Sequence, residues 1–428
     1  MSNELCYSVW LANAVSSRGD AYCRLIEKFG NARGVYAYAF EKEKADKLIT
    51  RKMLRELKNK DLSEAVSIVD YCVTSRIGIL TCTDGAYPRL LREISDFPAL
   101  LYVMGNMPDF ERFPATAVVG TRKMTEYGMH VAYQLGYGLA WGGSVVISGM
   151  AAGGDSMALC GALDAGGIPV AVLGCGLDRA YPAKNAKLMR EIAAKGAVIS
   201  EFAPGTEIRK QNFPQRNRII SGLSRAVCVT EGDEKSGALI TARHAQSQAR
   251  EVFAVPGNLG ASGSAGVNML IKDGASVLTG AEDVLRQYAF LYPAAVTLTP
   301  IEARSVDDAL LSARAHAVDT GALDIDVPTD EYVAEEKRPS VRIKERDCDI
   351  NITVSDEERI ITEEELMLVD EKTREVFYAL PEDEFAAESA VTKKLSVTDI
   401  LCALTLLEIN GLVRAIPGGK YVKARLKK

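Results

Sequence analysis

The amino-acid sequence predicts an α/β protein built around a doubly wound, mainly parallel sheet, with a small N-terminal helical domain before it and a C-terminal winged helix after it. Two observations lead to this fold class. Six short apolar runs rich in β-branched residues occur between residues 116 and 257, and helical patterns separate them. Continuous apolar strands that alternate with helices indicate a parallel sheet covered on both faces, and such sheets bind ligands at the carboxyl ends of their strands.

Residues 1–95 are predicted to form short helices, because apolar residues recur at helical spacing in 21–29 and 53–71. The segment 19–38 indicates a helix that ends at Phe29-Gly30 and is followed by a second helix start. This arrangement resembles a helix-hairpin-helix or SAM-like unit, a type of domain that can hold a DNA backbone through the amides of its hairpin. A small packing domain without a ligand explains the same pattern, and the sequence leaves both interpretations open.

Residues 96–291 carry the alternating β and α pattern. The predicted strands are TAVVG (116–120), SVVISG (144–149), IPVAVLG (168–174), AVISEF (197–202), AVCVTE (226–231) and EVFAVPG (251–257). Helical patterns between them include MHVAYQLGYGLAW, KNAKLMREIAAKG and ALITARHAQSQAR. Most of these strands end in Gly, Ser-Gly or an acidic residue, so the unusual chemistry of the chain is expected at the carboxyl edge of the sheet.

Beyond residue 291 the pattern is lost and the chain becomes acidic, with 19 Asp and Glu against 8 Lys and Arg in residues 301–365. We therefore expect residues 292–368 to form a disordered linker. In residues 369–428 two helical patterns and a hairpin with a Gly-Gly tip are typical of a winged helix. The last 18 residues contain six Lys and Arg and no acid, which suits an anionic partner.

Composition argues against several classes of protein. The nine cysteines lie far apart, with no C-x-x-C pair and no histidine at the spacing of a zinc site. Reduced thiols in a cytoplasmic protein, and no bound metal, are therefore expected. No stretch reaches about 18 uninterrupted apolar residues, so the sequence predicts no membrane-spanning helix.

The motifs of cofactor-dependent and nucleophilic enzymes are missing from the sequence. No G-x-G-x-x-G follows any strand, and the nearest segment, GCGLDR at 174–179, has Arg179 where the third glycine would let helix and strand touch. No G-x-x-x-x-G-K-[ST] loop occurs either, so we expect neither a dinucleotide nor ATP as a cofactor. The three histidines, His130, His244 and His316, accompany no G-x-S-x-G elbow.

A glycine-rich and arginine-rich edge stands out instead. SGMAAGGD at 148–155 joins a strand to a helix through small residues, so backbone N–H groups and a helix N-terminus can face an anion. The loop 205–224 combines four cations with Phe213, and Arg122 follows another strand. Cations neutralise phosphates and an aromatic ring stacks on bases, which is what single-stranded nucleic acid requires. Alternatively, RNRII simply opens a helix whose arginines pair with Glu201 and Glu231.

Eight motifs follow one another through the central region: VVGTR, SGMAAGGD, AVLGCGLDRAYPAKN, ISEFAPGT, FPQRNRIISGLS, SGALITARHA, REVFAVPG and GVNMLIKDGA. With this set the chain resembles the DNA-processing protein A (DprA/Smf) family over about residues 97–283. The resemblance implies an extended Rossmann-like domain that binds single-stranded DNA, forms a homodimer and loads the RecA recombinase during natural transformation. It implies a binding protein without a cofactor rather than an enzyme.

The resemblance also implies roles for individual residues. The phosphate-facing candidates are Arg122, Ser148, Gly149, Gly153, Arg209, Lys210, Arg216 and Arg218. Phe213 and Asn217 would contact bases, and Ser236, Gly237 and Thr241 would complete the pocket through a helix N-terminus. The chain departs from the family pattern at Ala152, Gly154 and Cys160, where Arg, Ile and His are usual. One cation and one ring are therefore missing from the first glycine-rich loop.

Two other functions fit parts of the sequence. The sheet also resembles that of the lysine-decarboxylase-like nucleotide phosphoribohydrolases, and Asp155, Glu201 and Glu231 lie at strand-end or loop positions suited to acid–base catalysis, although the PGGxGT-x-x-E signature is absent. In a third interpretation the winged helix is the main DNA reader and the central domain is a dimerising platform. The basic residues of that hairpin region are Arg414, Lys420, Lys423 and Arg425.

Overall fold

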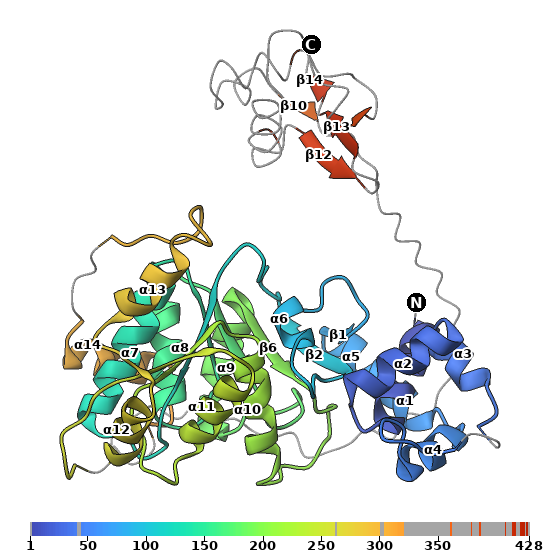
Figure 1. Cartoon of the computed structure of the whole chain (residues 1–428), viewed down its shortest axis with the longest axis horizontal. Helices are drawn as coiled ribbons and strands as arrows, with labels where there is room; N and C mark the ends of the chain where they lie inside the picture. Colours follow the sequence, from blue (N-terminus) through green and yellow to red (C-terminus); the bar gives the residue numbers. More distant parts are fainter. Residues whose placement is uncertain are drawn as a thin grey trace. The chain divides into compact units, whose positions relative to one another are not determined.

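The computed structural model describes residues 2–40, 44–261, 263–299 and 304–320, together with residues 360–361, 378, 385–386, 407, 413–416, 420–423 and 425–426. The chain divides into two compact units, Met1–Glu335 and Glu336–Lys428. In the first unit, helices cover a twisted sheet, and the N-terminal helices gather at one end of that sheet (Figure 1). The predicted helical region and the predicted sheet are therefore parts of one unit.

Five of the described helices precede the sheet: α1 (Ser2–Ala14), α2 (Gly19–Phe29), α3 (Ala32–Ala37), α4 (Arg51–Lys58) and α5 (Ser63–Thr74). α2 ends at Phe29, and Gly30 caps it with a φ of 85°, a conformation that favours glycine. Asn31 then caps α3, because its side chain accepts a hydrogen bond from the Gly34 N–H at 2.8 Å. The helix end at Phe29 and the second start that the sequence predicts are confirmed.

The sheet of the first unit has nine described strands in the order β1-β2-β6-β5-β4-β3-β7-β8-β9. Their bounds are β1 (Ile77–Thr81), β2 (Leu100–Gly105), β3 (Ala115–Val119), β4 (Val145–Ser148), β5 (Pro169–Val172), β6 (Ala197–Ser200), β7 (Ala226–Val229), β8 (Glu251–Ala254) and β9 (Ser276–Val277). Neighbours from β6 to β9 pair in parallel, and β2 pairs antiparallel with both β1 and β6. The six predicted strands correspond to β3–β8, so the mainly parallel sheet is confirmed.

Three strands fall outside the sequence prediction. β1 lies within residues 1–95, where short helices are predicted, so the sheet already begins at Ile77. β1 is an edge strand with partly exposed side chains, and it lacks the continuous apolar pattern of a strand buried on both faces. β2 is apolar, but its antiparallel pairing sets it apart from the alternating β and α pattern. β9 has only two residues.

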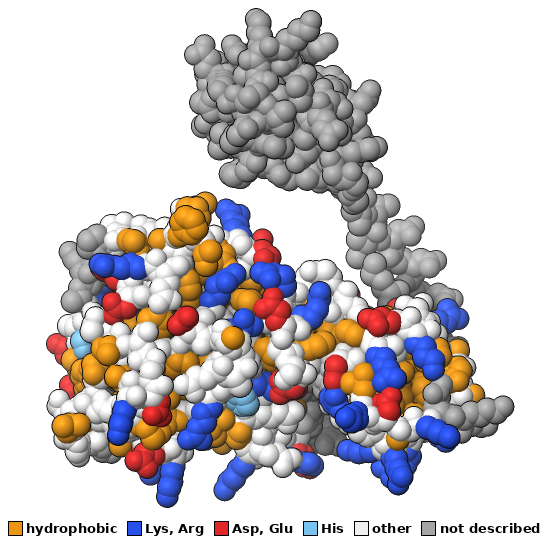
Figure 2. Space-filling view, viewed as in Figure 1, with side chains coloured by type: hydrophobic (Ala, Val, Ile, Leu, Met, Phe, Trp, Pro, Cys, Tyr) orange, Lys and Arg blue, Asp and Glu red, His pale blue; other side chains and the backbone are white. Residues whose placement is uncertain are grey.

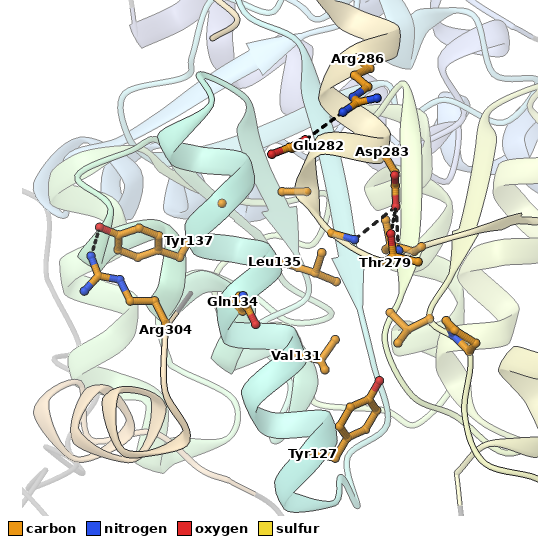
Figure 3. Close-up of a pocket in the computed structure, with 16 residues that line it drawn as sticks. Tyr127, Val131, Gln134, Leu135, Tyr137, Thr279, Glu282, Asp283, Arg286 and Arg304 are labelled. Atoms are coloured by element: carbon orange, nitrogen blue, oxygen red, sulfur yellow. Dashed lines mark hydrogen bonds and ion pairs between the residues drawn. The ribbon is translucent and has the colours of Figure 1, made fainter. Parts of the chain in front are cut away.

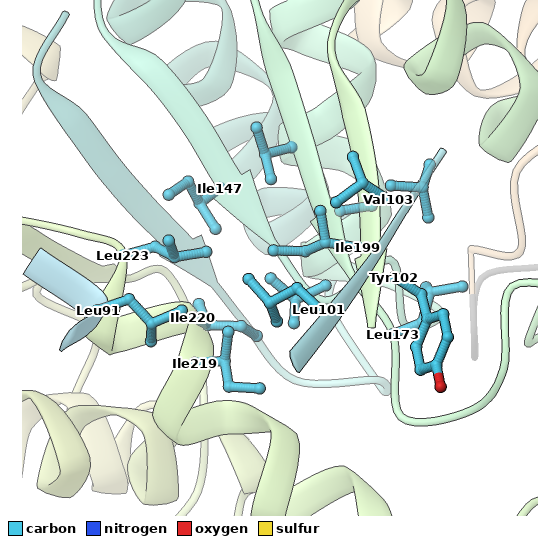
Figure 4. Packing of buried hydrophobic residues seen from close by; sticks show 14 of the residues in the cluster. Leu91, Leu101, Tyr102, Val103, Ile147, Leu173, Ile199, Ile219, Ile220 and Leu223 are labelled. Carbon is cyan, nitrogen blue, oxygen red and sulfur yellow. The ribbon is translucent and has the colours of Figure 1, made fainter. Parts of the chain in front are cut away.

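Helices cover both faces of the sheet, and successive side chains of a strand pack into different cores. Ile147 of β4 belongs to a core with Leu101 and Ile199, part of which Figure 4 shows, while Val146 belongs to a second core with Leu139 and Leu285. The helices after β1 are α6 (Arg89–Arg92), α7 (Glu126–Trp141), α8 (Gly154–Asp164), α9 (Ala186–Lys195), α10 (Asn212–Gly222), α11 (Gly237–Ser247), α12 (Ala265–Lys272), α13 (Ala281–Tyr288) and α14 (Val306–Ala315).

Helix α14 lies within residues 292–368, where the sequence predicts a disordered linker, and corrects that expectation for the described residues 304–320. It begins at a capping box in which Ser305 Oγ accepts from the Asp308 N–H at 3.1 Å, and the Asp308 carboxylate accepts from the Ser305 N–H at 2.8 Å. The helix packs on α7 and α8. We call residues 305–320 the strap. Residues 321–359 lie outside the described residues.

The second unit contains short described strands: β10 (Ile360–Ile361), β11 (Phe385–Ala386), β12 (Val413–Ile416), β13 (Lys420–Lys423) and β14 (Arg425–Leu426). β12 and β13 pair antiparallel, which confirms the predicted hairpin, and β13 also pairs with β11. The predicted helices of the winged helix lie almost wholly outside the described residues, so the winged helix stays a prediction. None of the described helices is both long and apolar enough to cross a membrane.

Candidate nucleic-acid interface

The carboxyl edge of the sheet brings together the loops that follow β3 to β7. In space β3 has β4 on one side and β7 on the other, so the order of the strands reverses between β3 and β7. In open α/β sheets ligands bind at such a switch point, outside the carboxyl ends of the strands. The residues that the sequence predicts as DNA contacts lie in these loops and at the starts of the helices that follow them.

An exposed cation and two aromatic rings meet at this edge. The Arg122 guanidinium lies over the Phe213 ring, 5.1 Å from its centroid. That ring in turn contacts Tyr181, with 5.0 Å between the centroids and 39° between the planes. Arg122 is exposed, whereas both rings are half-buried. A cation held on an aromatic ring offers a charge for a phosphate beside a surface on which a base can stack.

Arg216, in contrast, is buried and 3% exposed. Its Nη1 donates to the carbonyl oxygen of Gly149 at 2.6 Å and also to that of Val172, and its Nε donates to Asn217 Oδ1 at 3.2 Å. The side chain therefore ties α10 to the ends of β4 and β5. Burial lowers the pKa of Arg216 to about 10, an effect that the nearby Asp155 carboxylate opposes, so the guanidinium is charged at neutral pH.

Gly149 leaves room for this buried cation. A Cβ at this position would lie 2.5 Å from Arg216 Nη2 and 2.5 Å from Asp155 Oδ2, so no side chain fits. Asp155 Oδ1 also accepts from the Gly120 N–H at 3.3 Å. Burial raises the pKa of Asp155, and Arg216 acts against that rise. The packing of two opposite charges thus requires glycine at position 149, whatever ligand the edge binds.

Arg218 forms a buried ion pair, as the alternative in which RNRII merely opens a helix expects. Its Nη1 and Nη2 donate to the two carboxylate oxygens of Glu201, each at 2.7 Å. The side chains of Arg218 and Glu201 are 8% and 1% exposed. The Nε of Arg218 donates to the carbonyl oxygen of Asp96 at 3.0 Å. Glu231, the other acid named in that alternative, instead accepts from the Thr125 N–H at 2.9 Å.

Several other predicted residues also make contacts within the protein. Ser148 Oγ donates to a β3 carbonyl at 2.6 Å, and Asn217 Nδ2 donates to the Gly237 carbonyl at 3.3 Å. Ser236 caps α11 by accepting a hydrogen bond from its first turn at 3.3 Å. Thr241 is buried, whereas Gly237 is exposed. The structure therefore brings these residues to the edge, but mostly as parts of its framework.

The glycine-rich loop after β4 is covered by the strap. Gly153 precedes α8 with a φ of 84°, and its N–H donates to the Asp319 carbonyl at 2.9 Å. The next amide, that of Gly154, donates to the Thr121 carbonyl at 3.2 Å. Asn185 holds the strap from the other side, because its Oδ1 accepts from the Asp319 N–H at 2.7 Å. Two amides that the sequence predicts to face an anion therefore have acceptors within the protein.

The three departures from the family pattern lie in or beside this loop. Gly154 packs closely against the loop that follows β3, since a Cβ at position 154 would lie 2.8 Å from the Gly120 Cα. Cys160 is fully buried in α8. Ala152 is half-buried and supplies no charge. Close backbone packing thus explains the glycine at 154, while nothing in the structure explains the alanine at 152.

His316 fastens the strap to the helices beneath it. Its Nδ1 contacts a Glu191 carboxylate oxygen at 2.6 Å, and its Nε2 contacts Asp164 Oδ1 at 2.9 Å. The other oxygen of Asp164 accepts from the Tyr133 hydroxyl at 2.9 Å. Burial by itself would lower the pKa of His316, but its hydrogen bonds with Asp164 and Glu191 outweigh burial and raise the pKa.

Replacing His316 by alanine is expected to remove a stabilisation that depends on pH. The folded-state pKa lies above the unfolded value of about 6.5, so this contribution is fully present below about pH 6.5 and is lost as the pH rises through the folded-state pKa. Urea denaturation of the wild type and His316→Ala between about pH 5.5 and 9 measures it. A difference in free energy of unfolding that stays constant over this range would contradict the prediction.

His244→Ala is the matched control for this measurement. Burial lowers the pKa of His244 on α11, so its contribution to stability should grow as the pH rises. The two variants should therefore show opposite pH trends against the wild type.

Arg209 and Lys210 precede α10 and are exposed. Arg209 pairs with Glu207 at 3.0 Å, and an ion pair between two exposed side chains contributes little to stability. Figure 2 shows the Lys and Arg side chains of one face interspersed with acidic and hydrophobic ones. Of the five cations that the sequence predicts as phosphate contacts, Arg122, Arg209 and Lys210 are the exposed ones.

A cavity of about 660 Å³ lies between α7 and residues 278–286 (Figure 3). Arg304 donates to the Tyr137 hydroxyl in its wall, and Thr279 Oγ1 donates to the Asp283 carboxylate at 2.9 Å. None of the residues predicted to contact DNA lines it. The cavity is therefore distinct from the candidate interface.

Comparison with known proteins assigns the chain to a family. Residues 78–289 match the family model of DNA recombination-mediator protein A. The protein Smf of Synechocystis sp. is 35% identical over 347 residues, which cover 80% of this chain and 79% of that protein. The chain belongs to the DprA/Smf family.

Two further comparisons concern a DprA/Smf protein of Streptococcus pneumoniae. The DNA processing protein DprA of that organism is 42% identical over 207 residues, which cover 48% of this chain and 73% of that protein. The X-ray structure of its DNA processing protein A matches with a TM-score of 0.54 at 32% identity, covering 66% of this chain and 97% of that chain. The match to the DprA/Smf model begins within β1, so nearly all of the edge strand β1 and all of its neighbour β2 lie inside the family region.

Sequence reasoning missed three contributors to this edge. Tyr181 contacts the Phe213 ring at a tilt, and an aromatic residue beside a proline in AYPAKN is the signal that could have found it. Asp155 faces the buried Arg216, whereas the sequence suggests for this carboxylate only a role in acid–base catalysis. Asp319 covers the Gly153 amide, and no pattern in the sequence connects these two distant positions.

Proposed function

We propose that this protein binds single-stranded DNA along the carboxyl edge of its sheet and acts as a recombination mediator rather than as an enzyme. The observation that supports this most directly is the exposed Arg122 guanidinium over Phe213, beside Tyr181, at the switch point of the sheet. Membership of the DprA/Smf family points the same way. Its model describes a DNA recombination mediator, and its Streptococcus pneumoniae relative is a DNA processing protein.

In this proposal the predicted residues fall into two groups. The exposed cations and the ring contact DNA directly, through phosphates and through stacking on a base. The direct contacts are Arg122, Arg209, Lys210 and Phe213, together with the exposed backbone of Gly237 at the start of α11. The other residues shape the edge and position α8, α10 and α11. These are Ser148, Gly149, Gly153, Arg216, Asn217, Arg218, Ser236 and Thr241.

The proposal extends to the partners of the bound strand. A few exposed cations would bind single-stranded DNA of any sequence, with an affinity that falls as the salt concentration rises. Such binding suits a protein that passes its DNA strand to the RecA recombinase in natural transformation. We also propose a homodimer acting in the cytoplasm. The exposed side chains of Val277, Phe290 and Leu291, at 48%, 90% and 58%, support a protein partner on that side of the sheet.

Replacing Arg122 and Lys210 together by alanine is expected to weaken single-strand binding by roughly tenfold or more. Each neutralised phosphate contributes about −0.7 to the slope of log affinity against log salt, so losing two should reduce that slope by about 1.4. Fluorescence anisotropy of a labelled dT oligomer and of a matched duplex across a salt series measures both quantities. Lys195→Ala is the control, because Lys195 is exposed at the end of α9, at the opposite edge of the sheet.

Phe213→Leu separates stacking from charge. Leucine keeps an apolar side chain where the ring packs near Gly174, but removes the surface for a base. Binding should weaken by roughly tenfold with an unchanged salt slope. Wild-type affinity in both Arg122→Ala/Lys210→Ala and Phe213→Leu would overturn the proposed interface.

A further inference from the structure

Two cysteines from distant parts of the sequence meet where the N-terminal helices join the sheet. Cys23 lies on α2 and Cys82 directly follows β1, and their Sγ atoms are hydrogen-bonded at 3.5 Å. All seven cysteines in the described residues are free thiols. Cys23 is half-buried and the other six are buried. The pair thus combines a half-buried cysteine with a buried one.

The backbone on each side of the pair is fixed by hydrogen bonds. The Cys82 N–H donates to the Ala99 carbonyl at 2.9 Å, as a continuation of the pairing between β1 and β2. The start of α2 is tied to the same segment, because the Gly19 N–H donates to the Phe97 carbonyl at 2.9 Å, and the Ala99 N–H donates to the Ser17 carbonyl at 2.8 Å. The two sulfurs are therefore held in contact by the framework.

The surroundings shift the pKa values of the two thiols in opposite directions. The hydrogen bond with Cys82 lowers the pKa of Cys23 to about 7, with help from Arg92 and against burial, Glu27 and Asp20. The same hydrogen bond and burial raise the pKa of Cys82. A large fraction of Cys23 is therefore thiolate at neutral pH, and the thiolate is the form that attacks an oxidant. Cys82 keeps its proton.

We propose that Cys23 and Cys82 are a peroxide-oxidised thiol pair that forms a reversible disulfide between α2 and the end of β1. The Cys23 thiolate attacks one oxygen of hydrogen peroxide, which gives a sulfenic acid and releases hydroxide. The Cys82 sulfur then attacks the Cys23 sulfur and displaces its hydroxyl group. The Cys82 proton and the solution proton released when Cys23 ionised complete two water molecules, so two thiols lose two electrons and peroxide gains them.

The geometry suits this second step. A disulfide has an S–S length of about 2.05 Å, so sulfurs that are 3.5 Å apart must approach by roughly 1.5 Å. A change of side-chain torsion at the half-buried Cys23 supplies this movement while α2 and β1 keep their hydrogen bonds. The bond would close a loop across 59 positions of the chain and clamp the N-terminal helices to the sheet.

The test treats the full chain with hydrogen peroxide at neutral pH, blocks remaining thiols with iodoacetamide, and maps peptides by mass spectrometry without reduction. The expected product is a Cys23–Cys82 peptide, formed with loss of two thiols per chain and reversed by dithiothreitol. The midpoint of thermal unfolding should rise by on the order of 5 °C on oxidation and return on reduction. Cys72→Ser is the control, since burial raises the pKa of that thiol to about 11 and the pair should oxidise as in the wild type.

Variants of Cys82 test the assigned roles. In Cys82→Ser and Cys82→Ala, oxidation should stop at a Cys23 sulfenic acid that dimedone traps. The alanine variant also loses the hydrogen bond from Cys82. The pKa of Cys23, measured from the pH dependence of its alkylation rate by iodoacetamide, should therefore rise from about 7 towards the usual value for a cysteine. The proposal is overturned if peroxide oxidises other cysteines while Cys23 and Cys82 stay reduced, or if dimedone fails to label Cys23 in both folded variants.

Discussion

Replacing Arg216 by alanine is expected to lower the free energy of unfolding by about 3–5 kcal/mol, a large share of the roughly 5–15 kcal/mol of an ordinary domain. The guanidinium is 3% exposed and donates to the carbonyl oxygens that end β4 and β5. Removing it leaves these acceptors and the buried Asp155 carboxylate without their partner. A buried charge that loses its counterpart destabilises far more than a lost surface contact.

Urea denaturation of the wild type, Arg216→Ala and Arg209→Ala measures this effect. Arg209 is exposed and pairs only with an exposed Glu207, so its variant should lie within about 0.5 kcal/mol of the wild type. The decrease in free energy of unfolding caused by Arg216→Ala should be smaller at low pH. Burial already raises the pKa of Asp155, and its protonation removes the charge that Arg216 balances in the wild type. A loss below about 1 kcal/mol would show that Arg216 does not support the edge.

Breaking the pair of Arg218 and Glu201 is expected to have an effect of similar size. Arg218→Met should lower the free energy of unfolding by about 3–5 kcal/mol, because it leaves a Glu201 side chain that is 1% exposed without its two hydrogen bonds at 2.7 Å. Glu201→Leu should be similarly damaging, since it leaves the buried guanidinium with the exposed Asp96 carboxylate, 3.2 Å from its Nε, as its remaining ion pair. The double variant Glu201→Leu/Arg218→Met replaces both charges by apolar groups of comparable volume.

A double-mutant cycle separates the pair from its surroundings. We expect the double variant to be less destabilised than the sum of the two single variants, with a coupling free energy of roughly 1–3 kcal/mol. Denaturant midpoints of the four proteins, measured at one pH, give this value. Additive losses would mean that the two side chains act independently. Single-strand binding should be measured only where each variant is folded, because loss of fold would imitate loss of a DNA contact.

The six central strands could be predicted because a parallel sheet buried on both faces requires continuous apolar runs. β1 could not, since an edge strand with partly exposed side chains lacks such a run. α14 has its signal in the sequence, a serine followed three positions later by an aspartate, but the surrounding acidic composition concealed it. The sequence pattern thus predicts a strand or helix well when the element has the same kind of burial along its whole length.

The loops of the candidate site could be predicted, but the exposure of their arginines could not. Arg122 and Arg216 both belong to the carboxyl edge, yet one is exposed and the other is 3% exposed. Their positions explain the difference, because Arg122 lies in the loop after β3, whereas Arg216 begins a stretch of α10 in which every residue up to Gly222 is buried. Which arginines are exposed therefore depends on how α10 packs in the fold, which a list of charged residues does not contain.

The core beneath the N-terminal helices continues under β1 and β2, and β1 forms one border of the sheet. A polypeptide cut at residue 95 would lose β1 and leave the apolar β2, LLYVMG, with a row of unpaired N–H and C=O groups. Such a border is a template for strands of other molecules, so the shortened chain would be prone to aggregate. Residues 1–95, through β1, thus also protect the sheet against self-association.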